Sequence, residues 1–150
     1  MKYWLMKTEP EMYSIDNLKE DKRGSWDGVR NYQARNFMME MQKGDLVLFY
    51  HSNTKTIGVV GIAKVIKESY PDHTAYDKKN EHFDPKSKKE NPTWYMVDVE
   101  FVKKFKNTVT LEEIKNNKKL KDMKIVQKGN RLSVTPVSKK EFQTIVEMSQ

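Results

Sequence analysis

Cysteine is absent from this chain of 150 residues, and so is any long apolar segment. Without a thiol, the chain has no cysteine nucleophile, no thiolate zinc ligand and no disulfide framework of the kind that small secreted domains use. No segment approaches the roughly 20 apolar residues that a membrane-spanning helix needs. The apolar start is short and is stopped by Lys7 and Glu9, which does not fit a secretory signal. We therefore expect a cytoplasmic protein, or a nuclear one in a eukaryote, with no membrane partner.

Motifs for metal, nucleotide and catalytic sites are also missing. The chain has three histidines in separate segments, without an H-x-H or H-E-x-x-H spacing: His51, His73 and His82. Neither glycine-rich phosphate-binding motif, G-x-x-x-x-G-K-[ST] or G-x-G-x-x-G, occurs. The aspartates that offer paired carboxylates are Asp72, Asp77, Asp84 and Asp98, and acids in loops are most often solvated turn formers. The sequence therefore predicts no metal, no cofactor and no catalytic residue.

A net charge of +7 and an isoelectric point near 9.4 suit a polyanionic partner. Most of the 28 basic residues are lysines spread along the chain, which is typical of a solvated surface. The four arginines are more informative, because Arg23, Arg30 and Arg35 lie close together and only Arg131 is distant. Arginine offers a planar fork that pairs with phosphate or base edges and stacks on rings. A bound ligand is therefore expected near the segment that contains Arg23, Arg30 and Arg35.

One domain, residues 1–150, is expected, because no repeat, linker or low-complexity tract interrupts the chain. Apolar and β-branched runs predict strands over residues 3–7, 46–51, 57–66, 94–105 and 131–137. Gly58 and Gly61 indicate a bulge or a close backbone approach in the third of these strands. Residues 70–92 are polar and contain prolines, which predicts a long loop.

Helix signals lie between and after these strands. Ser14 is a candidate cap for a short helical turn to Leu18, and apolar spacings of three and four predict a helix over residues 31–41 that ends before Gly44. Two capping boxes of the S/T-x-x-E form start at Thr110 and Ser138. The element order predicts an α+β or mixed α/β domain around a strongly bent sheet or a small barrel, and the pattern does not choose between them.

Three segments carry more polar and aromatic side chains than a core requires. They are W-L-M-K-T-E-P at residues 4–10, S-W-D-G-V-R-N-Y-Q-A-R-N at 25–36 and L-F-Y-H-S at 48–52. Taken singly, each residue has a structural explanation: Trp26 as a core residue, Tyr50 as a buried ring, Asn31 as a helix cap. Together, an aromatic face, amides and hydroxyls are what recognition of an unstacked base requires.

The same segments resemble the EVE domain family of the PUA-like superfamily. The resemblance covers almost the whole chain and includes, besides these segments, Y-P-D at residues 70–72, F-D-P-K-S at 83–87, M-V-D-V at 96–99 and R-L-S-V-T-P-V at 131–137. Thr8 stands where the family usually has serine, and residues 77–82 are unusually lysine-rich. The resemblance implies an α+β fold with a small, strongly curved β-barrel and short helices around it.

The resemblance also implies a function, because EVE-type modules have been proposed to read methylated or hydroxymethylated cytosine. The related YTH domains read N6-methyladenine through an aromatic cage. Carried onto this chain, the base pocket is expected to contain Lys7, Thr8, Trp26, Asn31, Tyr50, His51 and Ser52. Trp26 is expected to stack on the base, with Asn31, Thr8 and Ser52 at its polar edge. Phosphate or backbone contacts are expected from Arg30, Arg35 and Arg131.

The expected protein is thus a monomeric, non-catalytic module that binds DNA or RNA carrying a modified base. Two alternatives stay open at this stage. One is an enzyme acting on a flipped base or on RNA, with His51 and a loop aspartate as acid–base partners, because histidine titrates near neutrality. The other is a small-molecule or protein-binding module that shares the fold, because a fold does not fix a function.

Overall fold

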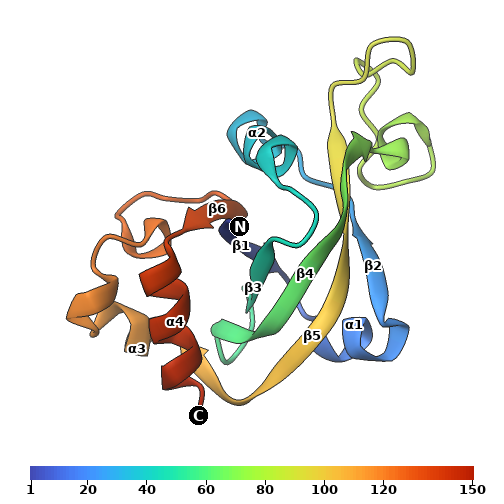
Figure 1. Ribbon diagram of the computed structural model, residues 1–150. Coiled ribbons are helices and arrows are strands. Elements are labelled where there is room, and N and C mark those ends of the chain that lie inside the picture. The colour runs from blue at the N-terminus through green and yellow to red at the C-terminus, as the bar shows by residue number, and fades with distance from the viewer.

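A computed structural model of the chain describes all residues from Met1 to Gln150 and contains one six-stranded mixed sheet with four α-helices (Figure 1). The strands are β1 (Tyr3–Thr8), β2 (Arg23–Trp26), β3 (Leu46–His51), β4 (Gly58–Pro71), β5 (Tyr95–Thr110) and β6 (Val134–Val137). The α-helices are α1 (Ile15–Asp21), α2 (Tyr32–Glu40), α3 (Leu111–Lys115) and α4 (Lys139–Met148). Three short 3₁₀ helices are η1 (His73–Tyr76), η2 (Lys118–Leu120) and η3 (Lys124–Val126). None of the helices has the length and apolar composition that a membrane crossing needs.

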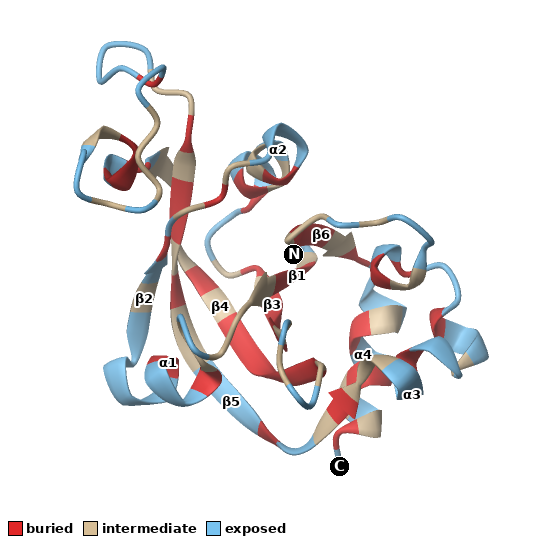
Figure 2. Cartoon of the chain, turned by 180° about the vertical axis from the view of Figure 1, so that it is seen from behind, coloured by how far each residue is buried: buried red, intermediate tan, exposed pale blue.

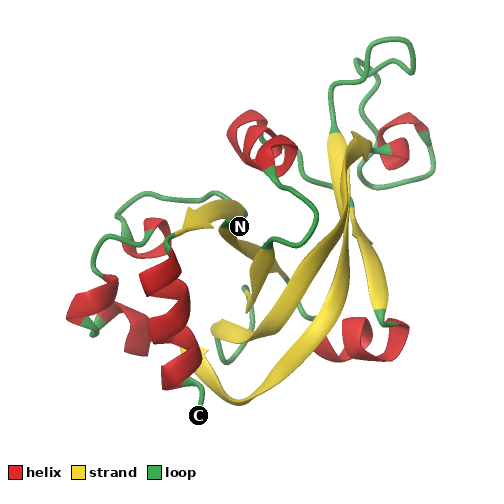
Figure 3. Cartoon of the chain, viewed as in Figure 1, coloured by secondary structure: helices red, strands yellow, loops and turns green.

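The sheet is strongly bent but open. Its strand order is β2-β5-β4-β3-β1-β6, and only the β1–β3 pair is parallel. The long strands β4 and β5 run together across the molecule (Figure 3). The α+β class is confirmed, but the closed barrel is not, because no ladder joins the edge strands β2 and β6. Both edge strands have four residues, and Pro136 in β6 lacks the N–H that a further ladder needs.

Gly61 lies where the register of the β4–β5 pair shifts. A Cβ at this position would lie 2.3 Å from the carbonyl oxygen of Lys103 on the neighbouring strand, closer than any side chain permits. The predicted bulge or close approach in this strand is therefore confirmed. The shift adds local twist and so contributes to the bend of the sheet.

Two hydrophobic cores lie on opposite faces of the sheet. Trp4, Met6 and Phe49 belong to the first core, together with apolar residues of α1 and α2. Leu5 and Leu48 belong to the second, together with residues of α3 and α4. Because neighbouring residues of one strand point to opposite faces, β1 and β3 contribute to both cores. Buried positions are concentrated on the central strands, whereas β2, part of β5, the loops and the outer sides of the helices carry exposed positions (Figure 2).

The predicted caps are confirmed. Ser14, Thr110 and Ser138 each accept a hydrogen bond from the backbone of the first helical turn that follows, and Asn31 does so for α2. Strands β4 and β5 are longer than predicted, β6 begins at Val134 instead of residue 131, and the predicted loop contains η1. Strand β2 was not predicted, because four residues without apolar alternation carry too little pattern.

Candidate functional site

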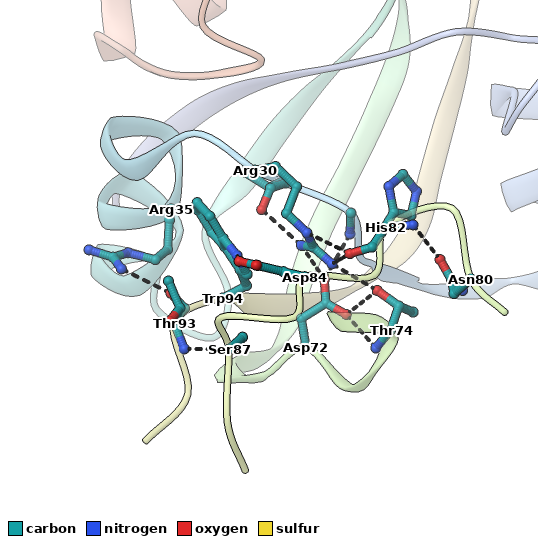
Figure 4. A network of polar contacts seen from close by, with 12 residues as sticks. Arg30, Arg35, Asp72, Thr74, Asn80, His82, Asp84, Ser87, Thr93 and Trp94 are labelled. Carbon is teal, nitrogen blue, oxygen red and sulfur yellow. Dashed lines mark hydrogen bonds and ion pairs between the residues drawn. The ribbon is translucent and has the colours of Figure 1, made fainter. Parts of the chain in front are cut away.

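The W-D-G-V-R-N-Y segment, residues 26–32, holds the long segment between β4 and β5 in place (Figure 4). Arg30 donates from Nη1 to the carboxylate of Asp72 at 3.0 Å and from Nη2 to the Thr74 hydroxyl at 3.1 Å. Its Nε and Nη2 also donate to the carbonyl oxygen of His82, at 3.0 and 2.7 Å. Arg30 therefore uses its planar fork inside the protein, and a phosphate contact from it is not supported by this geometry.

Asp72 is completely buried, so the expectation that it is a solvated turn former is wrong. Burial tends to raise the pKa of its carboxyl group, but hydrogen bonds from Thr74, the Gly28 amide and Arg30 outweigh this and hold the pKa below its usual value. The Gly28 amide donates at 2.8 Å. By contrast, burial and the nearby Asp72 raise the pKa of Asp27. A buried carboxylate is stable here because it accepts hydrogen bonds from Arg30, from the Gly28 amide, and from both the amide and the hydroxyl of Thr74.

Gly28 is required by both its backbone conformation and its surroundings. Its φ is +79°, in the left-handed region, and a Cβ there would lie 2.5 Å from Nε2 of His82. The His82 ring thus packs directly over the Gly28 backbone. The segment after β4 is seated against this turn, which positions it beside the start of α2.

Trp26 belongs to the first core. Its indole is 9% exposed and meets the ring of Phe49 edge-on, with ring centroids 5.3 Å apart. Phe49 in turn lies 5.7 Å from the His51 ring. The structure therefore brings Trp26 and His51 to the same face of the sheet, around Phe49, but it offers no open indole face on which a base would stack.

The ends of β1 and β3 bring Thr8, His51 and Ser52 together. Thr8 and His51 are register partners, and the Ser52 amide donates to the Thr8 carbonyl oxygen at 3.0 Å. Nε2 of His51 accepts a hydrogen bond from the Ile15 amide at 3.1 Å, which requires the neutral imidazole. Burial lowers the pKa of His51 in agreement with this. With its Nε2 lone pair occupied, His51 is a poor candidate for the acid–base role in the enzyme alternative.

Lys7 and Tyr50 lie on the opposite face of the sheet from Thr8 and His51. Tyr50 is 2% exposed within the second core, and burial raises the pKa of its hydroxyl to about 12. The Lys7 ammonium lies 5.8 Å from the Tyr50 ring centroid, and burial lowers its pKa. The seven residues predicted for the base pocket are therefore divided between two faces.

A groove of about 540 Å³ brings Asn31 and Arg131 together. It runs between the start of α2 and the segment that precedes β6, and its other polar lining residues include Gln33, Lys124, Lys128 and Asn130. The Asn31 side-chain oxygen caps α2 through the Ala34 amide, while its amide nitrogen donates to no protein acceptor. The groove thus combines three basic side chains with free amide groups.

The groove connects to the strand ends through the backbone. The Lys7 amide donates to the carbonyl oxygen of Ser133 at 2.8 Å, directly after Arg131 and Leu132 in the groove wall. Gly129 turns this wall with a φ of +80°. The candidate site therefore consists of this groove and the adjoining end of β1 and β3.

Two features of the region next to the site were not predicted from the sequence. The burial of Asp72 was not predicted, because nothing in Y-P-D distinguishes a buried, hydrogen-bonded aspartate from a solvated turn residue. Tyr32 was not singled out, although it is 61% exposed and stacks on Trp94. The sequence feature that could have indicated Tyr32 as a binding residue is its position between Asn31 and Arg35.

Comparisons with known proteins show the family. The family model for the EVE domain matches residues 2–148. Mouse thymocyte nuclear protein 1 is 44% identical over 99% of this chain and 74% of its own length. A solved Pseudomonas syringae protein has a TM-score of 0.97 and 43% identity, with 99% of both chains covered. Human THYN1, solved in complex with DNA containing 5-methylcytosine, has a TM-score of 0.94 and 41% identity, covering 100% of this chain and 98% of that one.

Proposed function

This chain belongs to the EVE domain family, and we propose that it is a non-catalytic module that binds nucleic acid and holds a chemically modified base. The observation that carries the proposal is the similarity to human THYN1, which has been solved in complex with DNA containing 5-methylcytosine. Methylated cytosine in DNA is therefore the first ligand to test. RNA is the second.

The charge of the groove supports this proposal. Lys124, Lys128 and Arg131 line one wall, and lysine and arginine near phosphates release bound counterions. Phosphate contacts of this kind fix the register of a bound strand without reading its sequence. The proposal therefore assigns backbone binding to these residues and to Arg35, and leaves Arg30 to its internal network.

Base reading is assigned to the polar groups beside the groove. The free amide of Asn31 and the side chains of Thr8 and Ser52 supply donors and acceptors for a base edge. His51, held neutral by the Ile15 amide, presents its other ring nitrogen as a donor. Trp26 and Tyr50 lie in the two hydrophobic cores behind these polar groups. Stacking of Trp26 on a base would require its ring to move away from Phe49.

The test is binding of short oligonucleotides that differ only in one 5-methyl group on cytosine. We expect tighter binding of the methylated strand and affinity that falls steeply as salt rises. Equal binding of both strands would remove the modified base from the proposal. Absence of binding to DNA and RNA at low salt would overturn the proposal and favour a small-molecule or protein ligand.

A further inference from the structure

Tyr32 is an aromatic residue on the outside of the protein, at the first position of α2. Tyr32 is 61% exposed, whereas tyrosine residues are usually at least partly covered by neighbouring side chains. Its ring stacks on Trp94, with centroids 5.0 Å apart and planes inclined by 29°. Tyr32 thus extends a stack outward from a buried indole.

The indole beneath Tyr32 is held from several sides. Trp94 is 5% exposed, and its Nε1–H donates to the Asp84 carboxylate at 2.6 Å. Arg30 lies 5.5 Å from the indole, and Arg35 donates to the neighbouring Thr93 carbonyl oxygen at 2.9 Å (Figure 4). A ring resting on this indole loses little freedom on binding, because its support is already ordered.

The outer face of the Tyr32 ring is free. The Arg35 guanidinium carbon lies 5.0 Å from the Tyr32 centroid and 6.0 Å from the Trp94 centroid. If Arg35 lay on the face of Tyr32 opposite Trp94, its guanidinium would be about 10 Å from the indole, because the Arg35–Tyr32 and Tyr32–Trp94 distances would then add. Arg35 therefore lies over the Tyr32 ring on the same side as Trp94, and it does not cover the opposite face of that ring.

Basic residues occur on the segments next to the stacked pair. Arg35 uses three of its five N–H groups on Asn36 and Thr93, so two stay available. Lys86 and Lys88 are exposed on either side of Ser87, whose hydroxyl accepts from the Thr93 amide. A flat apolar surface bordered by cations matches a base attached to its phosphates.

We propose that the free face of Tyr32 is a second base-stacking site, which takes an unpaired nucleobase next to the base held in the groove. Residues Asn31 and Gln33, on either side of Tyr32 in the chain, both line the groove. One strand therefore reaches both places, with Arg35 donating to the intervening phosphate. This inference rests on the proposed function, and it predicts that a single strand or a flipped-out base binds better than an intact duplex.

The experiment measures binding of single-stranded DNA with one central 5-methylcytosine and fluorescent 2-aminopurine at a flanking position. Tyr32→Leu keeps an apolar side chain without a ring, and we expect it to bind about tenfold more weakly, as loss of one base–aromatic stack does. Tyr32→Trp restores stacking and binding. Met39→Ala is the matched control, because Met39 is 47% exposed on the same helix.

Quenching of 2-aminopurine separates stacking from a structural effect. Wild type and Tyr32→Trp quench the fluorescence on binding, whereas Tyr32→Leu does not. Wild-type affinity and quenching in Tyr32→Leu would overturn this inference and leave the proposed function intact. Failure of the wild type to bind any oligonucleotide would overturn both, and would leave Tyr32 as an exposed ring for a protein partner.

Discussion

Arg30 and Asp72 form an ion pair at 3.0 Å across 42 residues of sequence, and the Asp72 carboxylate is fully buried. The pair joins the turn before α2 to the segment after β4. Because Asp72 also accepts from the Gly28 amide and the Thr74 hydroxyl, its charge is satisfied by donors from two distant parts of the chain. The W-D-G-V-R-N-Y motif therefore has a structural role besides any contact with a ligand.

Removal of the charge on Asp72 should destabilise the protein strongly. Asp72→Asn leaves Arg30 without its partner, and breaking one side of a buried pair costs about 3–5 kcal/mol. Asp77→Asn is the control, because Asp77 is an exposed aspartate in the same segment and surface changes cost about 0.5 kcal/mol or less. Urea unfolding gives the stability of both variants, and equal midpoints would show that the Arg30–Asp72 pair does not stabilise the fold.

Gly28→Ala should cost more than Gly129→Ala. The two glycines have nearly the same φ, +79° and +80°, so the backbone strain of about 1–2 kcal/mol is shared. Only at Gly28 does the new Cβ meet the His82 ring, whereas nothing lies within 4 Å at Gly129. The difference between the two free energies of unfolding isolates the His82 contact. Equal losses would show that the ring moves aside freely.

Acidification should destabilise the protein partly through His51. Burial lowers the folded-state pKa below the unfolded value near 6.5, with Asp16 opposing and Lys104 adding to the shift. The unfolded chain then binds a proton first, so this contribution is complete above about pH 6.5 and is lost as the pH falls through the folded pKa. His51→Gln keeps an acceptor for the Ile15 amide and removes the titration. Stability of the two proteins measured from pH 7.5 to 5 should therefore converge, and parallel curves would contradict a neutral His51.

Trp26→Ala should lower the free energy of unfolding by about 3–5 kcal/mol, because a buried ring leaves a cavity. Trp26→Phe keeps an aromatic edge against Phe49 and should lose clearly less. Binding of the methylated strand is then compared between wild type and Trp26→Phe, which both stay folded. A stable Trp26→Ala variant would show that the indole is not the core residue described above.

Charge removal in the groove should change the salt dependence of binding. Lys128→Ala and Arg131→Ala each delete one phosphate partner, and the slope of log affinity against log salt should fall by about 1 for each. Lys106→Ala is the control, because Lys106 is exposed and its neighbour Asn107 bonds to Ser149 near the C-terminus, an end of the chain that lies away from α2 (Figure 1). Unchanged slopes in the groove variants would place the nucleic acid elsewhere on the protein.

Local signals in the sequence predicted much of the fold. The caps at Asn31, Thr110 and Ser138 depend on residues three positions apart, and such short-range hydrogen bonds are readable from the chain. Strand β2 and the open edges of the sheet depend on pairing between distant segments, which no local pattern contains. For the same reason the barrel expected from the resemblance was not confirmed.

The candidate site was predictable only as a list of segments. Residues 7, 8, 50 and 51 were expected to converge, but strand alternation sends Lys7 and Tyr50 to one face and Thr8 and His51 to the other. Arg30 was predicted to contact phosphate, because its internal partner Asp72 lies 42 residues away and no local pattern links the two. Burial of Asp72 and exposure of Tyr32 are likewise properties of the folded surface and not of their neighbours in sequence.

The hydrogen bonds of Arg30 have a dynamic consequence for the surface above them. Trp94 stacks on Tyr32 and ends the segment between β4 and β5, which Arg30 binds at the His82 carbonyl oxygen. Detachment of this segment from Arg30 would therefore also move Trp94 away from Tyr32. Amide hydrogens of Gly28 and Thr74 should accordingly exchange with deuterium in one cooperative event, since both are bonded to Asp72. An occupant resting on Tyr32 would slow that exchange at sites it never touches.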